Sequence, residues 1–292
     1  MINQEFLASG GLDFTISKQK MYTEASNMTD YDETQFYATI RNDNKKSLGC
    51  VTDRYVVKQN KDLLDTVLTK IGEGNYDLSK SKCGAFKGGK KVFFFIKINN
   101  KVDFGQEMAD SYIYAISSHD GSARLTFGIS TELHSCSNMF SVLMADKDNS
   151  HTVKHTKAIE QIVNDKSIDD LISRNTKGLS RIMINMQGTE VKQGFINQIL
   201  DLVGRVDGKK VLEASREKRT LLAESIKEEC KMKGNDYYGV FNGVTHYLTH
   251  KVRERQTEEW FDFNLNGKGS SITTSALKLI VKQMKEDGVC LN

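Results

Sequence analysis

Residue types that can carry out chemistry gather in the segment 117–138, which reads SSHDGSARLTFGISTELHSCSN. The segment begins with the pair His119-Asp120 and ends with Cys136 and Asn138. A histidine beside a carboxylate or a thiol can build a nucleophile site or a metal site. The same residue types are also typical of a hairpin turn followed by a helix cap. The spacing of the residues has to decide between these interpretations.

The dipeptide Asp120-Gly121 lies between two runs of strand-forming residues. Such a dipeptide predicts a tight hairpin turn, because both central residues of a type I′ turn need positive φ. In the catalytic alternative, His119 is a general base that Asp120 orients. Neighbouring residues of a strand point to opposite faces, so Asp120 is poorly placed for that task. We therefore favour the turn.

A zinc site is the second alternative for this region. His134 and Cys136 are two residues apart, and they would need His151 and His155 to complete four ligands. Protein zinc sites are usually assembled from two compact ligand pairs, and only the two later histidines have such a spacing. The favoured interpretation makes Cys136 a small buried residue and has Ser137 or Asn138 cap a helix that begins at Met139. We expect no metal and no cofactor.

Signature motifs of catalysis are absent from the sequence. The glycine-rich stretch that ends at Lys90 is followed by Lys91, whereas a phosphate-binding P-loop requires Ser or Thr there. No GxGxxG, GxSxG or HExxH pattern occurs. The sequence therefore predicts no catalytic residue, and an enzyme remains only an alternative.

A lysine-rich segment offers a different function. Residues 80–101, KSKCGAFKGGKKVFFFIKINNK, contain seven lysines and no acidic residue around a Gly-Gly turn. Lysines neutralise phosphates, and the interleaved Phe86 and Phe93–Phe95 would stack on unpaired bases. Alternatively, VFFFI is a buried central strand with lysines at its ends. The predicted nucleic-acid-binding residues are Lys80, Lys82, Lys87, Lys90, Lys91, Lys97, Lys101, Arg124 and Lys154.

The overall composition is that of a globular, water-soluble protein. Of the 292 residues, 38% are hydrophobic and 27% charged, and no apolar run approaches the length of a membrane span. The N-terminus lacks the basic and apolar regions of a signal peptide. Five cysteines without CxxC spacing favour a reducing compartment. We expect a cytoplasmic protein without a membrane partner.

The residue patterns predict an α+β fold. The first half is typical of strands and hairpins, interrupted by one helix for which Asn60 is the predicted N-cap and Gly72 the C-terminal stop. The second half contains amphipathic helices, among them a long charged helix near 208–234 and a last helix closed by Gly288. We expect a β-rich region at 1–148 and a helical region at 149–292, which form either two domains or one continuous domain.

The order of these motifs resembles the phage/plasmid-like protein family, whose domain is known as the domain of unknown function numbered nine-three-two. The resemblance extends from about Gly49 to Val252. Lys154 stands where the family usually has an arginine, and a lysine cannot make the bidentate contact of a guanidinium group. The residues that carry the resemblance most specifically are His119, Asp120, Gly121, Cys136, Asn138, His155 and Thr156.

The resemblance implies a product of a phage or mobile element, and it implies no particular activity. In architecture the chain is also distantly similar to single-strand annealing proteins of the Rad fifty-two kind. The leading hypothesis is therefore a non-enzymatic protein that binds and anneals single-stranded DNA during recombination or replication, as a homo-oligomer such as a ring. The alternatives are an enzyme acting on nucleic acid or nucleotides, and a phage protein that counters a host system.

Overall fold

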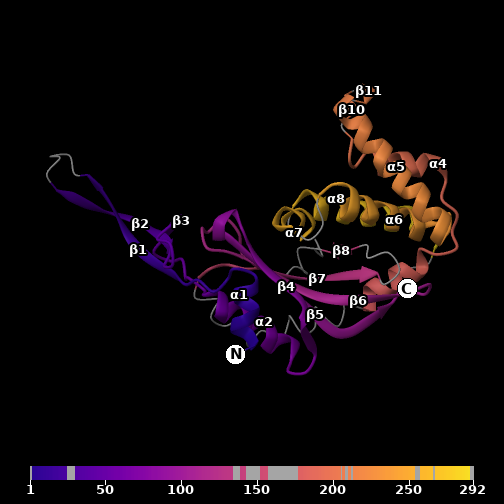
Figure 1. Cartoon of the computed structure of the whole chain (residues 1–292). Helices are drawn as coiled ribbons and strands as arrows, with labels where there is room; N and C mark the ends of the chain where they lie inside the picture. The colour runs from indigo at the N-terminus through magenta and orange to yellow at the C-terminus, as the bar shows by residue number, and fades with distance from the viewer. Residues whose placement is uncertain are drawn as a thin grey trace. The chain divides into compact units, whose positions relative to one another are not determined.

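The chain folds into an α+β structure, as the sequence predicts (Figure 1). The structure is a computed structural model. It describes residues 2–24, 30–133, 139–142, 152–156, 177–204, 206–207, 210–211, 213–253, 257–265 and 267–289. The predicted boundary at 148, Cys136 and Asn138 lie outside these residues. The chain forms two compact units that interleave in sequence. Unit 1 comprises 1–99, 112–128 and 150–170, and unit 2 comprises 100–111, 129–149 and 171–292.

Unit 1 begins with the short helix α1 (Ile2–Ser9), which leads into a three-stranded antiparallel sheet. The strands are β1 (Ile16–Glu24), β2 (Tyr31–Arg41) and β3 (Ser47–Thr52), and β2 lies between the other two. Helix α2 (Asn60–Ile71) follows, and it buries Leu63, Leu64, Val67 and Leu68 at helical spacing. Gly72, with a φ of 87°, ends this helix, as predicted.

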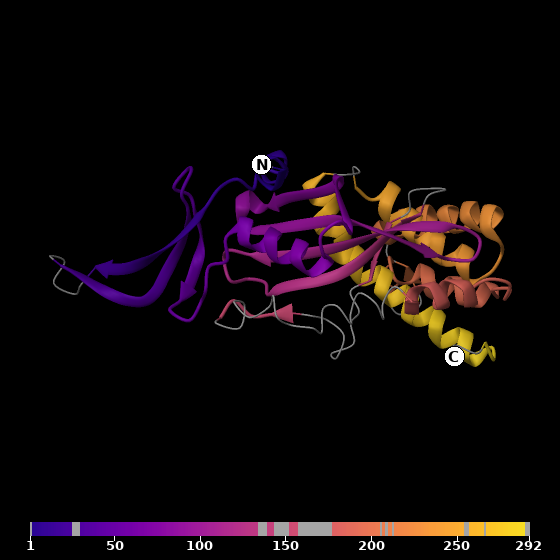
Figure 2. The same ribbon diagram turned by 90° about the horizontal axis from the view of Figure 1, so that it is seen from below.

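A larger sheet contains the strands in the order β4-β5-β6-β7-β8, with the short β9 (Thr152–Val153) also paired to β7. Their bounds are β4 (Tyr76–Phe86), β5 (Lys91–Asp103), β6 (Met108–Ser118), β7 (Leu125–Leu133) and β8 (Met139–Val142). The turn between β4 and β5 is the one-turn helix η1 (Lys87–Gly89), in which all three residues have positive φ. The sheet is drawn in purple to pink in Figure 2.

Strand β5 is interior to this sheet, and its segment Val92–Ile96 is buried along its whole length. Consecutive side chains of a strand point to opposite faces of the sheet. When both faces are buried, all of these residues are apolar and the sequence shows a continuous hydrophobic run. This finding confirms the second interpretation of VFFFI. The phenylalanines Phe86, Phe93, Phe94 and Phe95 are at most 4% exposed, so the prediction that they stack on bases is wrong.

Unit 2 is mainly helical. Its helices are α4 (Gln193–Leu200), α5 (Glu213–Lys233), α6 (Tyr237–His246), the π-helical turn η3 (Tyr247–Lys251), α7 (Glu258–Leu265) and α8 (Lys268–Glu286). Residues 177–185 are also helical, and β10 (Val206–Asp207) pairs with β11 (Lys210–Val211). The core includes Met183, Phe195, Tyr237, Phe241 and Ile280. None of the helices in the described part of the chain is long and apolar enough to cross a membrane.

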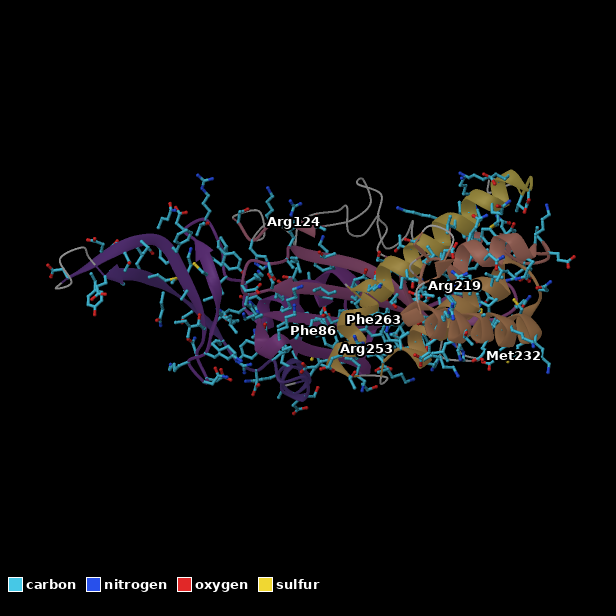
Figure 3. The ribbon with its side chains drawn as sticks, turned by 90° about the horizontal axis from the view of Figure 1, so that it is seen from above. Phe86, Arg124, Arg219, Met232, Arg253 and Phe263 are labelled. Atoms are coloured by element: carbon cyan, nitrogen blue, oxygen red, sulfur yellow. The ribbon has the colours of Figure 1, made fainter. Side chains whose placement is uncertain are left out.

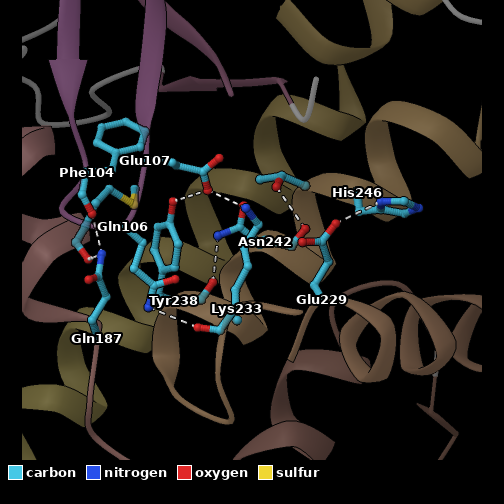
Figure 4. A network of polar contacts seen from close by, with 12 residues as sticks. Phe104, Gln106, Glu107, Gln187, Glu229, Lys233, Tyr238, Asn242 and His246 are labelled. Carbon is cyan, nitrogen blue, oxygen red and sulfur yellow. Dashed lines mark hydrogen bonds and ion pairs between the residues drawn. The ribbon is translucent and has the colours of Figure 1, made fainter. Parts of the chain in front are cut away.

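A buried polar network holds the loop before β6 in place within unit 2 (Figure 4). Glu107 forms an ion pair with Lys233 at the end of α5, and the side chains are only 11% and 10% exposed. The hydroxyl group of Tyr238 donates a hydrogen bond of 2.7 Å to the same carboxylate. Gln106 donates to the backbone carbonyl of Lys233 over 3.0 Å. The loop is therefore attached to two helices by contacts that water reaches poorly.

We expect Glu107→Gln to lower the free energy of unfolding by roughly 3 kcal/mol, because it leaves the buried ammonium group of Lys233 without its counter-charge. The matched control is Glu286→Gln, which removes the acid of an exposed ion pair with Lys282, whose side chains are 54% and 75% exposed. That change should cost less than about 1 kcal/mol. Urea denaturation of the two variants and the parent checks this difference, and equal losses would contradict it.

Candidate functional site

The candidate site is a cleft of about 490 Å³ in unit 1. Three segments that are far apart in sequence line it. The first includes the end of β3 and the residues after it (50–52, 54 and 55), the second is the β6–β7 loop (120–124), and the third follows β9 (154–156). The structure brings together in this cleft six of the residues that sequence reasoning singled out, whereas His119 and the predicted lysines of β4, β5 and their turn do not line it. Those that line the cleft are Asp120, Gly121, Arg124, Lys154, His155 and Thr156.

The β6–β7 loop forms one wall of the cleft, and hydrogen bonds within the loop stabilise its turn. The carboxylate of Asp120 accepts a hydrogen bond of 2.9 Å from the backbone N–H of Ser122, and Gly121 has a φ of 75°. Ser118 closes the loop, since its hydroxyl donates to the carbonyl of Ala123 and accepts from the N–H of that residue, each over 2.9 Å. The predicted hairpin is confirmed. Only Gly121 has positive φ, however, so the expectation of a two-residue type I′ turn is wrong.

This loop packs directly on β3 at a glycine. A Cβ atom on Gly49 would lie 2.5 Å from the Cβ and 2.7 Å from the Cα of Asp120. Real Cβ atoms do not approach so closely, and the obstructing atoms belong to the loop backbone and to its first side-chain carbon. Gly49 therefore allows the close approach that sets the width of the cleft at this point.

His155 forms part of the cleft and is almost fully buried, with 6% exposure. Its ring stacks on Tyr55, with 4.9 Å between centroids and 11° between planes. The Nδ1 atom faces the carbonyl of Val56 at 3.4 Å, so this nitrogen carries the proton. The Nε2 atom then accepts a hydrogen bond of 3.0 Å from the hydroxyl of Ser117. Burial lowers the pKa of His155, so the ring is neutral at pH 7.

The pair of Ser117 and His155 has the hydrogen bond of a serine–histidine dyad, but its position does not suit catalysis. Ser117 is 1% exposed and is not among the residues that line the cleft. Tyr55, the ring stacked on His155, donates its hydroxyl proton to the carbonyl of Ser118 over 2.6 Å. Burial, together with the nearby charge of Asp120, raises the pKa of this phenol. These contacts hold the floor of the cleft and occupy both ring nitrogens of His155.

His119 lies outside the cleft, in the interior of unit 1. The amide nitrogen of Asn60 donates to the carbonyls of Leu12 and Phe14 over 3.1 and 3.3 Å, so its oxygen is the acceptor facing His119 Nε2 at 2.8 Å. His119 is completely buried, and burial lowers its pKa to about 4. When His155 is protonated at low pH, its positive charge also lowers the pKa of His119. The alternative in which His119 is a general base oriented by Asp120 is not what the geometry shows.

Asn60 also differs from its predicted role as the N-cap of α2. The cap is Gln59, and the side chain of Asn60 is 1% exposed and points to His119 and the N-terminal segment. Gln59 in turn pairs with the backbone of Ile16 through hydrogen bonds of 2.9 and 2.8 Å. Tertiary hydrogen bonds have therefore replaced the local cap that an asparagine at a helix start usually makes.

Three exposed cations surround the cleft: Arg54, Arg124 and Lys154 (Arg124 is labelled in Figure 3). None of their side chains forms an ion pair within the described residues. Asp120 is the acid in the lining, and one of its oxygens is occupied by the loop N–H. The cleft therefore presents a net positive surface over a neutral floor, which suits an anionic ligand.

The lysines of residues 80–101 do not form one cluster. Lys87, Lys90 and Lys91 lie at or beside the β4–β5 turn, and the carbonyl of Lys90 accepts a hydrogen bond of 2.7 Å from the N–H of His119, next to the cleft loop. Lys97 is further along β5, opposite Asp77. The remaining lysines of this segment are Lys80 and Lys82 on β4, and Lys101 in unit 2.

Sequence reasoning did not single out Arg54, Tyr55 or Cys50 as site residues. Arg54 and Tyr55 belong to the segment LGCVTDRYVV, which carries part of the family resemblance, and that was the available signal. Cys50 is exposed and lines the cleft. Across the described residues, no group of three histidine, cysteine or carboxylate side chains is arranged to hold a metal ion. The predicted motif residues Cys136 and Asn138 lie outside the described residues. The prediction of a helix from Met139 is wrong, because Met139–Val142 form strand β8, which pairs with β7.

Comparison with known proteins gives a family and no activity. A family model described as "Domain of unknown function (DUF932)" matches residues 47–267, which is more than half of the chain and includes every residue of the cleft lining. No curated protein and no solved structure matches the sequence.

Burial of neutral His119 should make the stability of unit 1 depend on pH. Its pKa is about 4 in the folded chain against an ordinary 6.5, so between these values the unfolded state binds more protons. Stability from this group is complete above about pH 6.5 and is lost as the pH falls to about 4, by roughly 3 kcal/mol. Urea denaturation at several pH values should show a smaller acid-induced loss for His119→Gln than for the parent. Parallel pH profiles would contradict the assignment.

Gly49→Ala should destabilise unit 1 by about 1–3 kcal/mol, because its new methyl group collides with the Asp120 backbone. Gly178→Ala is the matched control, since a Cβ there meets no atom within 4 Å and the residue is helical. The control should be neutral or stabilising by up to about 1 kcal/mol. Thermal denaturation of both variants checks the contrast, and a neutral Gly49→Ala would show that the loop does not need the close approach.

Proposed function

We propose that this chain, which belongs to the DUF932 family, binds single-stranded DNA through the basic cleft of unit 1 and catalyses no reaction. The observation that carries the proposal is the ring of exposed cations, Arg54, Arg124 and Lys154, around a cleft with a neutral floor. Positive side chains that form no ion pair within the described residues are available to phosphate groups, and they release counterions of the nucleic acid on binding.

A polyanion fits this surface better than a single small anion, because the cations continue beyond the cleft. The carbonyl of Lys90 is bonded to the residue that precedes Asp120, and Lys87 begins the same turn. The side chain of Lys46 approaches this turn as well, since its Nζ lies 2.9 Å from the place of a Cβ on Gly88. Cations on neighbouring turns suit the repeated phosphates of one strand.

The size of the cleft supports a single strand. A cavity of about 490 Å³ is in the range of small-ligand sites, so it takes a nucleotide or two of a flexible strand. A duplex keeps its bases inside and its phosphates on a wide cylinder that cannot enter. A strand held by its phosphates keeps its bases free to pair with a second strand, which is the requirement for annealing.

The geometry favours binding over an enzyme. The two nitrogens of His155 are engaged by Val56 and Ser117, and His119 is buried away from the cleft. A general base needs a lone pair aimed at a substrate. The enzyme alternative would therefore require a rearrangement of both histidines.

The test measures the salt dependence of binding to a fluorescently labelled single-stranded oligonucleotide. In the variant Arg54→Gln, Arg124→Gln, Lys154→Gln, the slope of log affinity against log salt should decrease in magnitude by about 2, since each phosphate contact on a single strand contributes about 0.7. Affinity at low salt should fall by roughly tenfold or more. Unchanged affinity and slope would rule out this cleft as the binding site.

The matched control removes the same charge from exposed lysines of the unit 2 helices, as Lys231→Gln, Lys278→Gln, Lys285→Gln, and should leave the slope unchanged. A third variant, Lys87→Gln, Lys90→Gln, Lys91→Gln, reports whether the strand continues over the β4–β5 turn. Duplex DNA of the same sequence serves as competitor. If the parent prefers the duplex, or binds neither form at low salt, the proposal fails.

A further inference from the structure

The hairpin of β1 and β2 exposes apolar side chains to an unusual degree. We define the arm as residues 19–24 and 30–36, the part of this hairpin furthest from α2 along the two strands (Figure 1). Met21, Tyr22, Tyr31 and Phe36 are 37, 55, 76 and 40% exposed. They are four of the seven exposed large hydrophobic residues in the described part of the chain, so this apolar exposure is concentrated in one element.

The arm has little support from its own chain. Among the described residues, β3 pairs with β2 from Phe36 to Ile40, and the segment from Tyr31 to Gln35 is paired with β1 alone. A two-stranded ribbon that buries neither face is marginally stable in water. Exposed aromatic residues on such a ribbon are typical of a surface that a partner covers.

The strand register determines the chemistry of one face of the arm. Tyr22 lies opposite Glu33, and Glu24 lies opposite Tyr31. Residues directly opposite in an antiparallel pair share a face, and so do residues two apart in one strand. Tyr22, Glu24, Tyr31 and Glu33 therefore form one aromatic and acidic face.

The charge of the arm identifies the partner. The arm contains one lysine, Lys20, which forms an ion pair of 3.4 Å with Glu33. It contains four acids, so its net charge is −3. This charge repels nucleic acid, whereas aromatic rings and carboxylates together bind arginine and lysine through cation–π contacts and ion pairs. An exposed group of such cations occurs in this same chain, at Arg54, Arg124 and Lys154.

We propose that the arm of one copy of the chain binds the basic cleft of a second copy, with its aromatic and acidic face against the cations. Because arm and cleft are different patches, the contact is head-to-tail, and repetition generates a closed ring or an open filament. This contact does not depend on DNA binding, although it uses the same cations, so arm and strand would compete for the cleft.

The experiment is sedimentation velocity on nuclease-treated, nucleic-acid-free protein. The arm variant is Tyr22→Ser, Glu24→Lys, Tyr31→Ser, and the cleft variant is Arg54→Glu, Arg124→Glu, Lys154→Glu; all six side chains are exposed, so the fold should be retained. The parent should form oligomers that grow with concentration, and each variant alone should be a monomer. An equimolar mixture should form a dimer and stop there, because only one intact arm and one intact cleft are complementary.

The controls Glu73→Lys and Lys278→Glu change exposed charges elsewhere and should assemble like the parent. A monomeric parent, or an arm variant that assembles normally, would overturn the proposal. A mixture that stays monomeric would show that the arm does not bind the cleft. Formation of the mixed dimer would also show that both variants are folded. Since no nucleic acid is present, these outcomes are independent of whether the cleft binds DNA.

Discussion

The cleft of unit 1 depends on the buried hydrogen bond between Asn60 and His119. The amide of Asn60 also donates to the carbonyls of Leu12 and Phe14, so one side chain connects the N-terminal segment, the start of α2 and the end of β6. The backbone N–H of His119 adds the β4–β5 turn through the carbonyl of Lys90. Burial of a polar group costs free energy unless it is hydrogen-bonded, so these bonds favour the joint assembly of the four segments. The loop that contains Asp120 and Arg124 directly follows His119 in sequence, so the packing of these four segments determines its position.

Much of the fold follows from local patterns. The run VFFFI, the Gly-Gly turn and the spacing of Leu63, Leu64 and Val67 each indicate the observed element, because hydrophobic periodicity and positive φ are properties of short segments. The division of the chain into interleaved units is a different matter, since it depends on which distant segments pack together. No single window of sequence contains that information.

The site was predictable as a set of residues and not as a geometry. Asp120, Gly121, His155 and Thr156 were identified, and they do meet in one cleft. The favoured interpretation, a turn at Asp120-Gly121, agrees with the observed loop. The burial and the hydrogen-bond partners of His119 and His155 could not be read from the motif, because they come from segments far away in the sequence. Asn60 was misassigned for the same reason: its cap signal is local, and its actual partners are 46 to 59 residues away.

The groups left available in the cleft define what it can do. Within the lining, the nitrogens of His155 are used by Ser117 and Val56, the hydroxyl of Tyr55 by Ser118, and one oxygen of Asp120 by Ser122. These bonds fix the walls, and each removes a group that could have transferred a proton. Among the described residues, Arg54, Arg124 and Lys154 are the lining cations whose side chains form no ion pair. Cations above a neutral floor suit a negatively charged ligand. If both proposals hold, the phosphates of a strand and the carboxylates of the β1–β2 arm compete for this surface, and the relative concentration of the two ligands decides which one occupies it.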